Sequence, residues 1–97
     1  MTSSLVPEII DRSTTLSVTS KTILARNEQR RAFLIQNVGA VNVGVNILGA
    51  DAAIGSAGTV TLVPNGQLSA EGFDCPKNGF TAIAASGTPA LTIWEQV

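Results

Sequence analysis

The chain has 97 residues, which is enough for one domain and too few for two. Val, Ile and Thr together number 27, whereas Phe, Trp and Tyr together number four, and β-branched residues of this kind favour pleated sheets. A hydrophobic share of 44% excludes intrinsic disorder, and a net charge of −1 with 13% charged residues argues against nucleic acid as a partner.

An extended N-terminal arm is expected over residues 1–13, ahead of a single β-sandwich domain over residues 14–97. Pro7 interrupts any continuous helix or strand in the arm. The apolar residues of the arm are Leu5, Val6, Ile9 and Ile10. The arm either docks on a partner or folds back over its own domain. The N-terminus lacks the positive region of a secretory signal, and no apolar run approaches the ~20 residues that span a bilayer, so no membrane partner is expected.

Short strands separated by turn signals are predicted from Thr14 onward. Leu16 and Val18 alternate with polar residues, which predicts the first strand. Further strands are expected at residues 23–24, 32–35, 41–47, 59–63, 67–71, 80–85 and 90–96. Six to eight short strands with turns every ~8–12 residues predict an all-β fold, either a small antiparallel sandwich or a jelly-roll-like barrel.

Two hairpins are expected among these strands. The continuous apolar run 32–35 is typical of a central strand buried on both faces. It leads through a turn at Gly39-Ala40 into the strand 41–47, whose alternating valines predict one buried face, and these two strands should pair. The next two strands flank Pro64-Asn65-Gly66, which is a strong hairpin signal.

Catalytic chemistry finds little support in this composition. The chain has no His, so imidazole zinc sites and His-based acid–base catalysis are absent, and one Cys allows no intrachain disulfide. A Ser–Lys arrangement with Lys21 or Lys77 is formally possible but disfavoured. Cys75 is expected to be a small buried hydrophobe. We therefore expect no enzyme, no cofactor and no metal site. The carboxylates of Asp51, Glu71 and Asp74 lack the dense spacing of a calcium loop.

The arginines form the only cluster of charge in the sequence. Arg26, Arg30 and Arg31 surround Glu28, and arginine binds carboxylates in a fixed fork. The cluster either contacts an acidic partner surface or is a solvated loop with internal pairing to Glu28.

Trp94 is the other candidate contact residue. In a strand it lies on the face opposite to Ile93, and an exposed tryptophan would anchor an interface. The alternative is a core tryptophan near a sheet edge. The lack of Tyr argues against a carbohydrate-binding face.

Four stretches of the chain carry a family resemblance. They are RRAFLIQN at residues 30–37, VNVGV at 41–45, LVPNGQ at 62–67, and residues 79–96 with their Ser-Gly-Thr turn. Together they resemble small virion β-domains of tailed bacteriophages. In those proteins an Arg-rich lead enters an I-Q-N strand, followed by a Val/Ile strand, a Pro-Gly turn, a Cys-Pro loop and an A-x-A-A-S-G-T hairpin. The resemblance covers about residues 26–97.

The resemblance implies a structural virion protein of the head-decoration, or cement, type. Such a protein binds the outer surface of a phage head, bridges subunits of the major capsid protein and commonly acts as a homotrimer. It would be made in the host cytoplasm and end on the capsid surface. The alternative is a tail-fibre, head-fibre or adaptor β-domain that attaches to another virion component or to the host surface. We expect the interface residues to be Leu5, Val6, Ile9, Ile10, Arg26, Arg30, Arg31 and Trp94.

Overall fold

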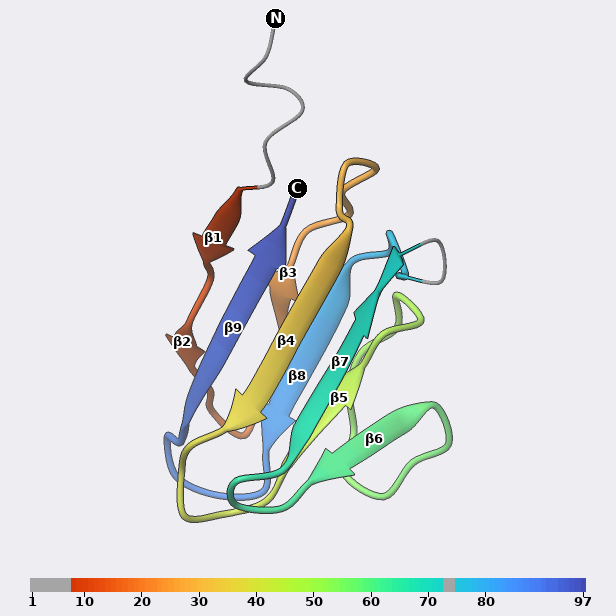
Figure 1. Cartoon of the computed structure of the whole chain (residues 1–97). Helices are drawn as coiled ribbons and strands as arrows, with labels where there is room; N and C mark the ends of the chain where they lie inside the picture. Colours follow the sequence, from red (N-terminus) through yellow and green to blue (C-terminus); the bar gives the residue numbers. More distant parts are fainter. Residues whose placement is uncertain (1–7, 73–74) are drawn as a thin grey trace, which may run out of the picture.

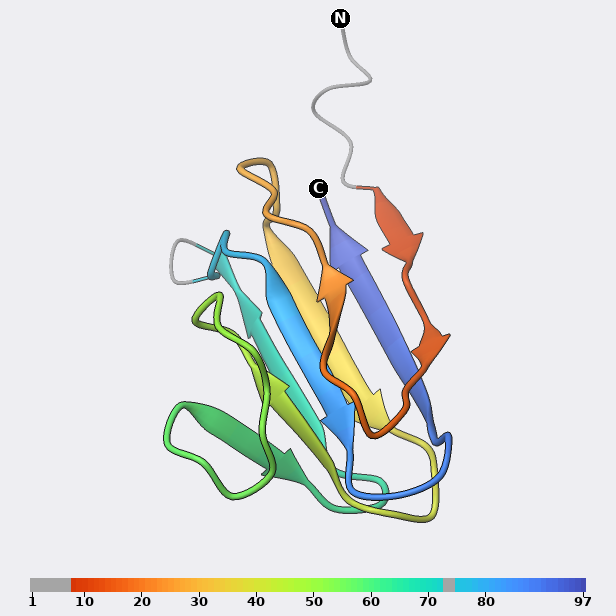
Figure 2. The ribbon, with the colours of Figure 1, turned by 180° about the vertical axis from the view of Figure 1, so that it is seen from behind.

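Two antiparallel sheets stacked face to face make up the computed structural model, which describes residues 8–72 and 75–97 (Figures 1 and 2). Sheet A contains β1 (Ile9–Asp11), β9 (Ala90–Gln96), β4 (Ala32–Asn37) and β7 (Gln67–Glu71) in this order, and β2 (Thr14–Thr15) also pairs with β9. Sheet B contains β3 (Lys21–Leu24), β8 (Phe80–Ala84), β5 (Val43–Asn46) and β6 (Thr59–Leu62) in this order. The all-β sandwich is thus confirmed. None of the described residues belongs to a helix long and apolar enough to cross a membrane.

The order of the strands is that of a jelly roll. The short strands β1 and β2 lie end to end along β9, so that they act as one interrupted strand (Figure 1). After β2 the chain passes from one sheet to the other at every connection except that between β5 and β6. Eight strands in two sheets connected in this way form the double Greek key of a jelly roll.

Both hairpin predictions were wrong, because the strands concerned lie in different sheets. β4 and β7 belong to sheet A, whereas β5 and β6 belong to sheet B, and the β8–β9 turn also crosses between sheets. The turn after β6 has the predicted chemistry, with Asn65 at φ 69° and the N–H of Gly66 donating to the carbonyl of Val63 at 2.7 Å. Facing sheets lie only ~10 Å apart, so a tight turn can join two sheets as well as two paired strands.

The N-terminal strands differ from the prediction in position. Residues 9–11, which were expected in the arm, form β1 of sheet A, so this part of the arm packs on its own domain. The predicted strand at Leu16 and Val18 is replaced by β2 at Thr14–Thr15. Leu16 is buried and its N–H donates to the carbonyl of Pro89, whereas Val18 is exposed.

The core lies between the inner faces of the sheets. Phe33, Ile35, Leu91 and Ile93 of sheet A pack toward Val43, Val45 and Phe80 of sheet B. The rings of Phe33 and Phe80 meet edge to face, with centroids 4.8 Å apart, an arrangement that aromatic pairs favour.

The burial of β4 and β5 is the reverse of what the sequence predicted. β4 was expected to be covered on both faces, but only Phe33, Ile35 and Asn37 are buried, while Ala32, Leu34 and Gln36 are partly exposed on the outer face. β5 was expected to be half-buried, but all four of its residues are buried. Its outer face is covered by the loop after it, since a Cβ on Gly44 would lie 3.1 Å from Ile54 Cδ1. On the outer face of sheet A, no such loop is seen among the described residues, and Trp94 and Ile9 are exposed there.

Candidate interaction surface

An apolar hollow lies on the outer face of sheet A, over β1, β9 and β4. The register places Trp94 between Asp11 on one side and Leu34 on the other. The hollow has a volume of about 80 Å³ and is lined by Ile9, Ala32, Phe33, Leu34, Trp94 and Gln96. Ile9 is 62% exposed and Trp94 47% exposed. We call the outward side chains Ile9, Ala32, Leu34, Trp94 and Gln96 the Trp94 face.

Strand alternation explains why this face exists. Ile93 and Glu95 point inward from β9 and are buried, so Trp94 between them points outward. The prediction that Trp94 and Ile93 lie on opposite faces is confirmed, and Trp94 is not a core residue. An exposed tryptophan beside exposed aliphatic groups is the kind of patch that marks a protein contact.

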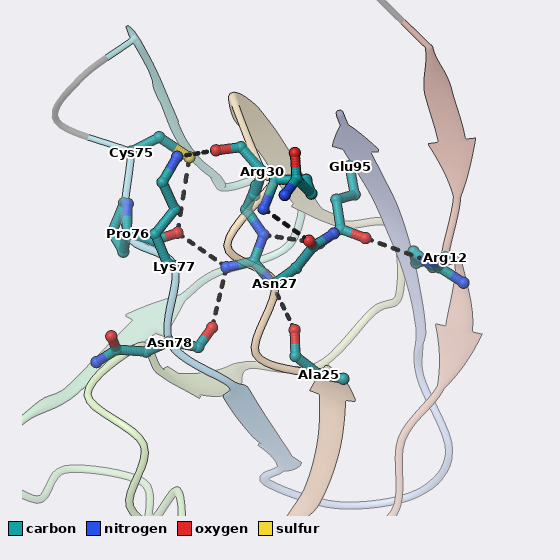
Figure 3. A network of polar contacts seen from close by, with 10 residues as sticks. Arg12, Ala25, Asn27, Arg30, Cys75, Pro76, Lys77, Asn78 and Glu95 are labelled. Carbon is teal, nitrogen blue, oxygen red and sulfur yellow. Dashed lines mark hydrogen bonds and ion pairs between the residues drawn. The ribbon is translucent and has the colours of Figure 1, made fainter. Parts of the chain in front are cut away.

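Arg30 lies inside the protein, between the end of β3 and the start of β4 (Figure 3). Its side chain is 0% exposed. Nε donates to Glu95 Oε2 at 2.8 Å, and the guanidinium carbon lies 4.7 Å from the ring centre of Phe80. The terminal nitrogens donate to the carbonyls of Ala25, Pro76 and Asn78 at 2.8–2.9 Å. Each of the three guanidinium nitrogens thus has a partner within the fold, as a buried charge requires.

Glu95 is the acceptor at the centre of this network. Besides Arg30, it accepts hydrogen bonds from Arg12 Nε at 3.2 Å and from Asn27 Nδ2 at 3.3 Å (Figure 3). Burial by itself would raise the pKa of the Glu95 carboxyl, but the hydrogen bonds from Arg30, Asn27 and Arg12 outweigh it and hold the pKa below its ordinary value. Glu95 therefore stays ionised and ties β9 to the β3–β4 loop.

The structure separates the arginines that the sequence grouped together. Arg30 is interior, which corrects the expectation that it contacts a partner. Arg26 forms an exposed ion pair with Glu28 at 2.6 Å, the internal pairing considered as the alternative. Arg31 is exposed, and its N–H donates to the carbonyl of Gln96.

The remaining predicted contact residues come from the arm. Ile9 lines the Trp94 face, whereas Ile10, paired with Glu95, is half-buried on the other side of the sheet. Leu5 and Val6 lie outside the described residues. The sequence did not predict Leu34 as a contact residue, because a continuous apolar run such as that of β4 is typical of a strand buried on both faces. Nor did it predict Arg12 and Glu95, for which the sequence carries no local signal.

A second, more polar cleft lies beside the network. It has a volume of about 290 Å³ and is lined by Arg12, Ile23, Leu24, Ala25, Arg26, Asn27 and Glu95. Of its charged groups, Arg12 pairs with Glu95 inside the cleft, and Arg26 pairs with Glu28 outside it. The charged groups that line the cleft are therefore already paired within the fold.

The groups considered for catalysis are engaged in other contacts. Lys21 Nζ donates to the hydroxyl of Thr14 at 2.8 Å, and Lys77 Nζ donates to the carbonyl of Arg30. Cys75 is buried, and burial raises the pKa of its thiol, outweighing the nearby Lys77 and Arg30. Within residues 8–72 and 75–97, no three His, Cys, Asp or Glu residues are grouped so as to hold a metal ion.

Comparison with known proteins supports the fold alone. No family model and no curated protein matches the chain. A chain from a solved structure of Bacillus endospore appendages, described as a novel family of disulfide-linked pili, matches with a TM-score of 0.57 and 15% sequence identity. The match covers 94% of this chain and 85% of the other. The chain is therefore similar to that pilus protein in the arrangement of its strands.

Proposed function

We propose that the chain is a structural subunit of a virus particle: a head-decoration protein that binds the outer surface of a tailed-phage capsid and bridges subunits of the major capsid protein. The Trp94 face is the observation that carries this proposal. It sets an exposed tryptophan among apolar groups on a sheet face that no described part of the chain covers. Such a surface suits contact with another protein, because the centres of interfaces are enriched in aromatic residues and depleted in charge.

The mode of action would be additive binding. A decoration protein works as a homo-oligomer, a trimer in the commonest arrangement, with each copy contacting the junction between capsid subunits. Several weak contacts made at once raise the effective affinity far above that of each. The chemistry of the sandwich is compatible with this passive role, since its buried charges are used to hold the fold together.

The second candidate is a fibre or adaptor domain of the virion. The Trp94 face would serve there as well, as a contact to another virion component or to the host surface. Copy number separates the two candidates. Many copies spread over the shell indicate decoration, whereas a few at one vertex indicate a fibre or adaptor.

The test uses particles from the source of this sequence. Mass spectrometry and electron microscopy of purified particles should find the chain in many copies on the shell. Shells stripped of the protein should bind it again in a sedimentation assay. Absence of the chain from particles, or failure of stripped shells to bind it, would contradict the proposal.

Two matched variants test the role of the Trp94 face. Trp94→Ser should reduce shell binding at least tenfold, because the anchor of the apolar surface is lost. Val18→Ser removes another exposed apolar side chain, which does not line the hollow, and it should bind like the wild type. Equal binding by both variants would show that the Trp94 face does not contribute to shell binding.

A further inference from the structure

We propose that the Trp94 face of one copy is filled by residues 1–7 of a second copy, with Leu5 or Val6 in the hollow. The proposal refines the proposed function: the Trp94 face would join copies of the chain to one another, and shell binding would depend on Trp94 through the many contacts of the oligomer. It rests on the proposed function only in giving the face a role in assembly. Four properties of the chain lead to it.

The first property is the size and chemistry of the hollow. About 80 Å³ between Ile9, Leu34 and Trp94 suits one aliphatic side chain and not an extended apolar ligand. The walls are almost wholly apolar, although Gln96 is among the lining residues. A short segment with one or two aliphatic residues among small polar ones would fit this surface.

The second property is that residues 1–7 are such a segment. Their sequence is Met-Thr-Ser-Ser-Leu-Val-Pro. Leu5 and Val6 are its adjacent branched aliphatic residues, preceded by three small hydroxyl residues. None of the seven side chains carries a charge, so docking in the uncharged hollow would bury no unpaired charged side chain.

The third property is the direction in which the chain enters sheet A. The N–H of Glu8 donates to the carbonyl of Val97 at 3.1 Å, and the N–H of Val97 donates to the carbonyl of Glu8 at 2.9 Å. The ladder between β1 and β9 thus continues to Glu8, and from Glu8 the strand β1 runs along β9 toward Trp94. The hollow lies on this C-terminal side of Glu8, so a segment N-terminal to Glu8 could reach the hollow of its own copy only by reversing its direction.

The fourth property is that the sequence opposes a tight return to the same copy. A reversal just before Glu8 would place Val6 and Pro7 at the two central positions of a turn. Proline is disfavoured at the second of these positions, because the residue before it is pushed into an extended conformation. Seven residues can extend up to about 23 Å, which is enough to reach a neighbouring molecule.

The resulting contact is head to tail: each copy gives its segment to one neighbour and accepts a segment from another. Contacts of this kind close into a ring when the rotation between copies allows it, and otherwise they continue as a filament. A closed ring of three would be the trimer expected of a decoration protein.

Trp94 provides the readout, since it is the only tryptophan and the chain has no Tyr. In the wild type, the oligomer should form as concentration rises, seen by light scattering after size exclusion, and Trp94 emission should shift to the blue as the hollow is filled. A donor variant with Leu5→Ser and Val6→Ser should stay monomeric with red-shifted emission. The matched control with Ser3→Ala and Ser4→Ala should behave like the wild type.

Mixing two variants then tests which part of each copy makes the contact: the segment 1–7 of one copy and the Trp94 face of the other. An acceptor variant, Leu34→Arg, should also be monomeric, and Trp94→Ser gives a second acceptor variant in case Leu34→Arg does not fold, as judged by circular dichroism. Mixing donor and acceptor variants should give a heterodimer, because one intact segment and one intact face remain. A monomeric wild type, an oligomer indifferent to the donor variant, or a mixture that stays monomeric would each overturn the inference.

The outcomes also keep the two proposals apart. A wild type that is monomeric yet binds stripped shells through Trp94 overturns the exchange of segments and supports decoration. An oligomer that needs Leu5 and Val6 but has no affinity for shells supports the exchange and contradicts decoration. A blue-shifted monomer that becomes red-shifted in the donor variant would mean that the segment docks on its own copy, which also overturns the exchange.

Discussion

The buried ion pair of Arg30 and Glu95 joins the β3–β4 and β7–β8 connections to sheet A. The guanidinium group bonds to one carboxylate and to three carbonyls, and the side chain is fully buried. A buried pair of this kind often adds little net stability over a hydrophobic pair, because both charges lose hydration. Removing one partner is costly, because the other charge is left in the interior.

Arg30→Met should therefore lower the free energy of unfolding by about 3–5 kcal/mol. The midpoint of urea denaturation measures this loss. Arg26→Ala is the matched control and should cost less than about 1 kcal/mol, because the Arg26–Glu28 pair is exposed. The double variant Arg30→Met with Glu95→Leu should recover part of the loss. If Arg30→Met were as stable as the Arg26→Ala control, the buried network would not contribute to the stability of the fold.

The free energy of unfolding should also depend on pH in the acid range, because of Glu95. Its pKa is lower in the fold than in the unfolded chain, so its contribution is present above the ordinary glutamate pKa of about 4.3 and is lost as pH falls through the lowered value. The difference in unfolding free energy between the wild type and Glu95→Gln should narrow over this acid range. Asp11, whose pKa is lowered by its hydrogen bonds with Ser13, is present in both proteins and cancels. A constant difference from neutral to acid pH would contradict this role.

At the scale of the elements, Asn37 holds together the connection that leads from β4 to β5. Its Nδ2 donates to the carbonyls of Val41 and Leu62 at 2.8 and 2.9 Å, and its Oδ1 accepts from the N–H of Gly39 at 3.0 Å. The turn also packs against the β8–β9 connection, because a Cβ on Gly39 would overlap that of Pro89 and lie 3.0 Å from its Cα. The connections at this end of the sandwich therefore support one another.

Gly39→Ala should destabilise the protein by about 1–3 kcal/mol, since the added methyl group forces these packed connections apart. Ala40→Ser changes the neighbouring exposed residue of the same turn and should be close to neutral. Thermal unfolding of the two variants under identical conditions measures the difference. Equal melting temperatures would show that the connections can separate without cost.

The strands could be predicted from the sequence more reliably than their pairing. Alternation and turn residues placed β7 and β9 within their observed bounds, because these signals act over a few neighbouring residues. Pairing depends on which sheet a strand joins, and Pro64-Asn65-Gly66 serves a crossing as well as it serves a hairpin. Likewise, the burial of Gly44 depends on the loop after β5 folding back over the sheet, and the exposure of Leu34 on the outer face of sheet A is not evident from the apolar run of β4.

At the scale of the whole molecule, assembly should not depend on redox conditions. Cys75 is buried, and the raised pKa of its thiol disfavours the reactive thiolate. The assembly state should be the same with and without a reducing agent, and a thiol reagent should react with Cys75 only after the protein is denatured. Loss of the oligomer on reduction would contradict this prediction and would indicate a bond between cysteines of different copies.

The position of β9 has a consequence for how the protein is made. The last strand of the chain is an inner strand of sheet A, with β1 and β2 on one side and β4 on the other. During translation, the N-terminal strands leave the ribosome long before the strand that pairs with them exists. Sheet A can therefore close only after β9 has been made, and until then β4 lacks its partner on that side and its inner apolar residues stay open to wrong contacts.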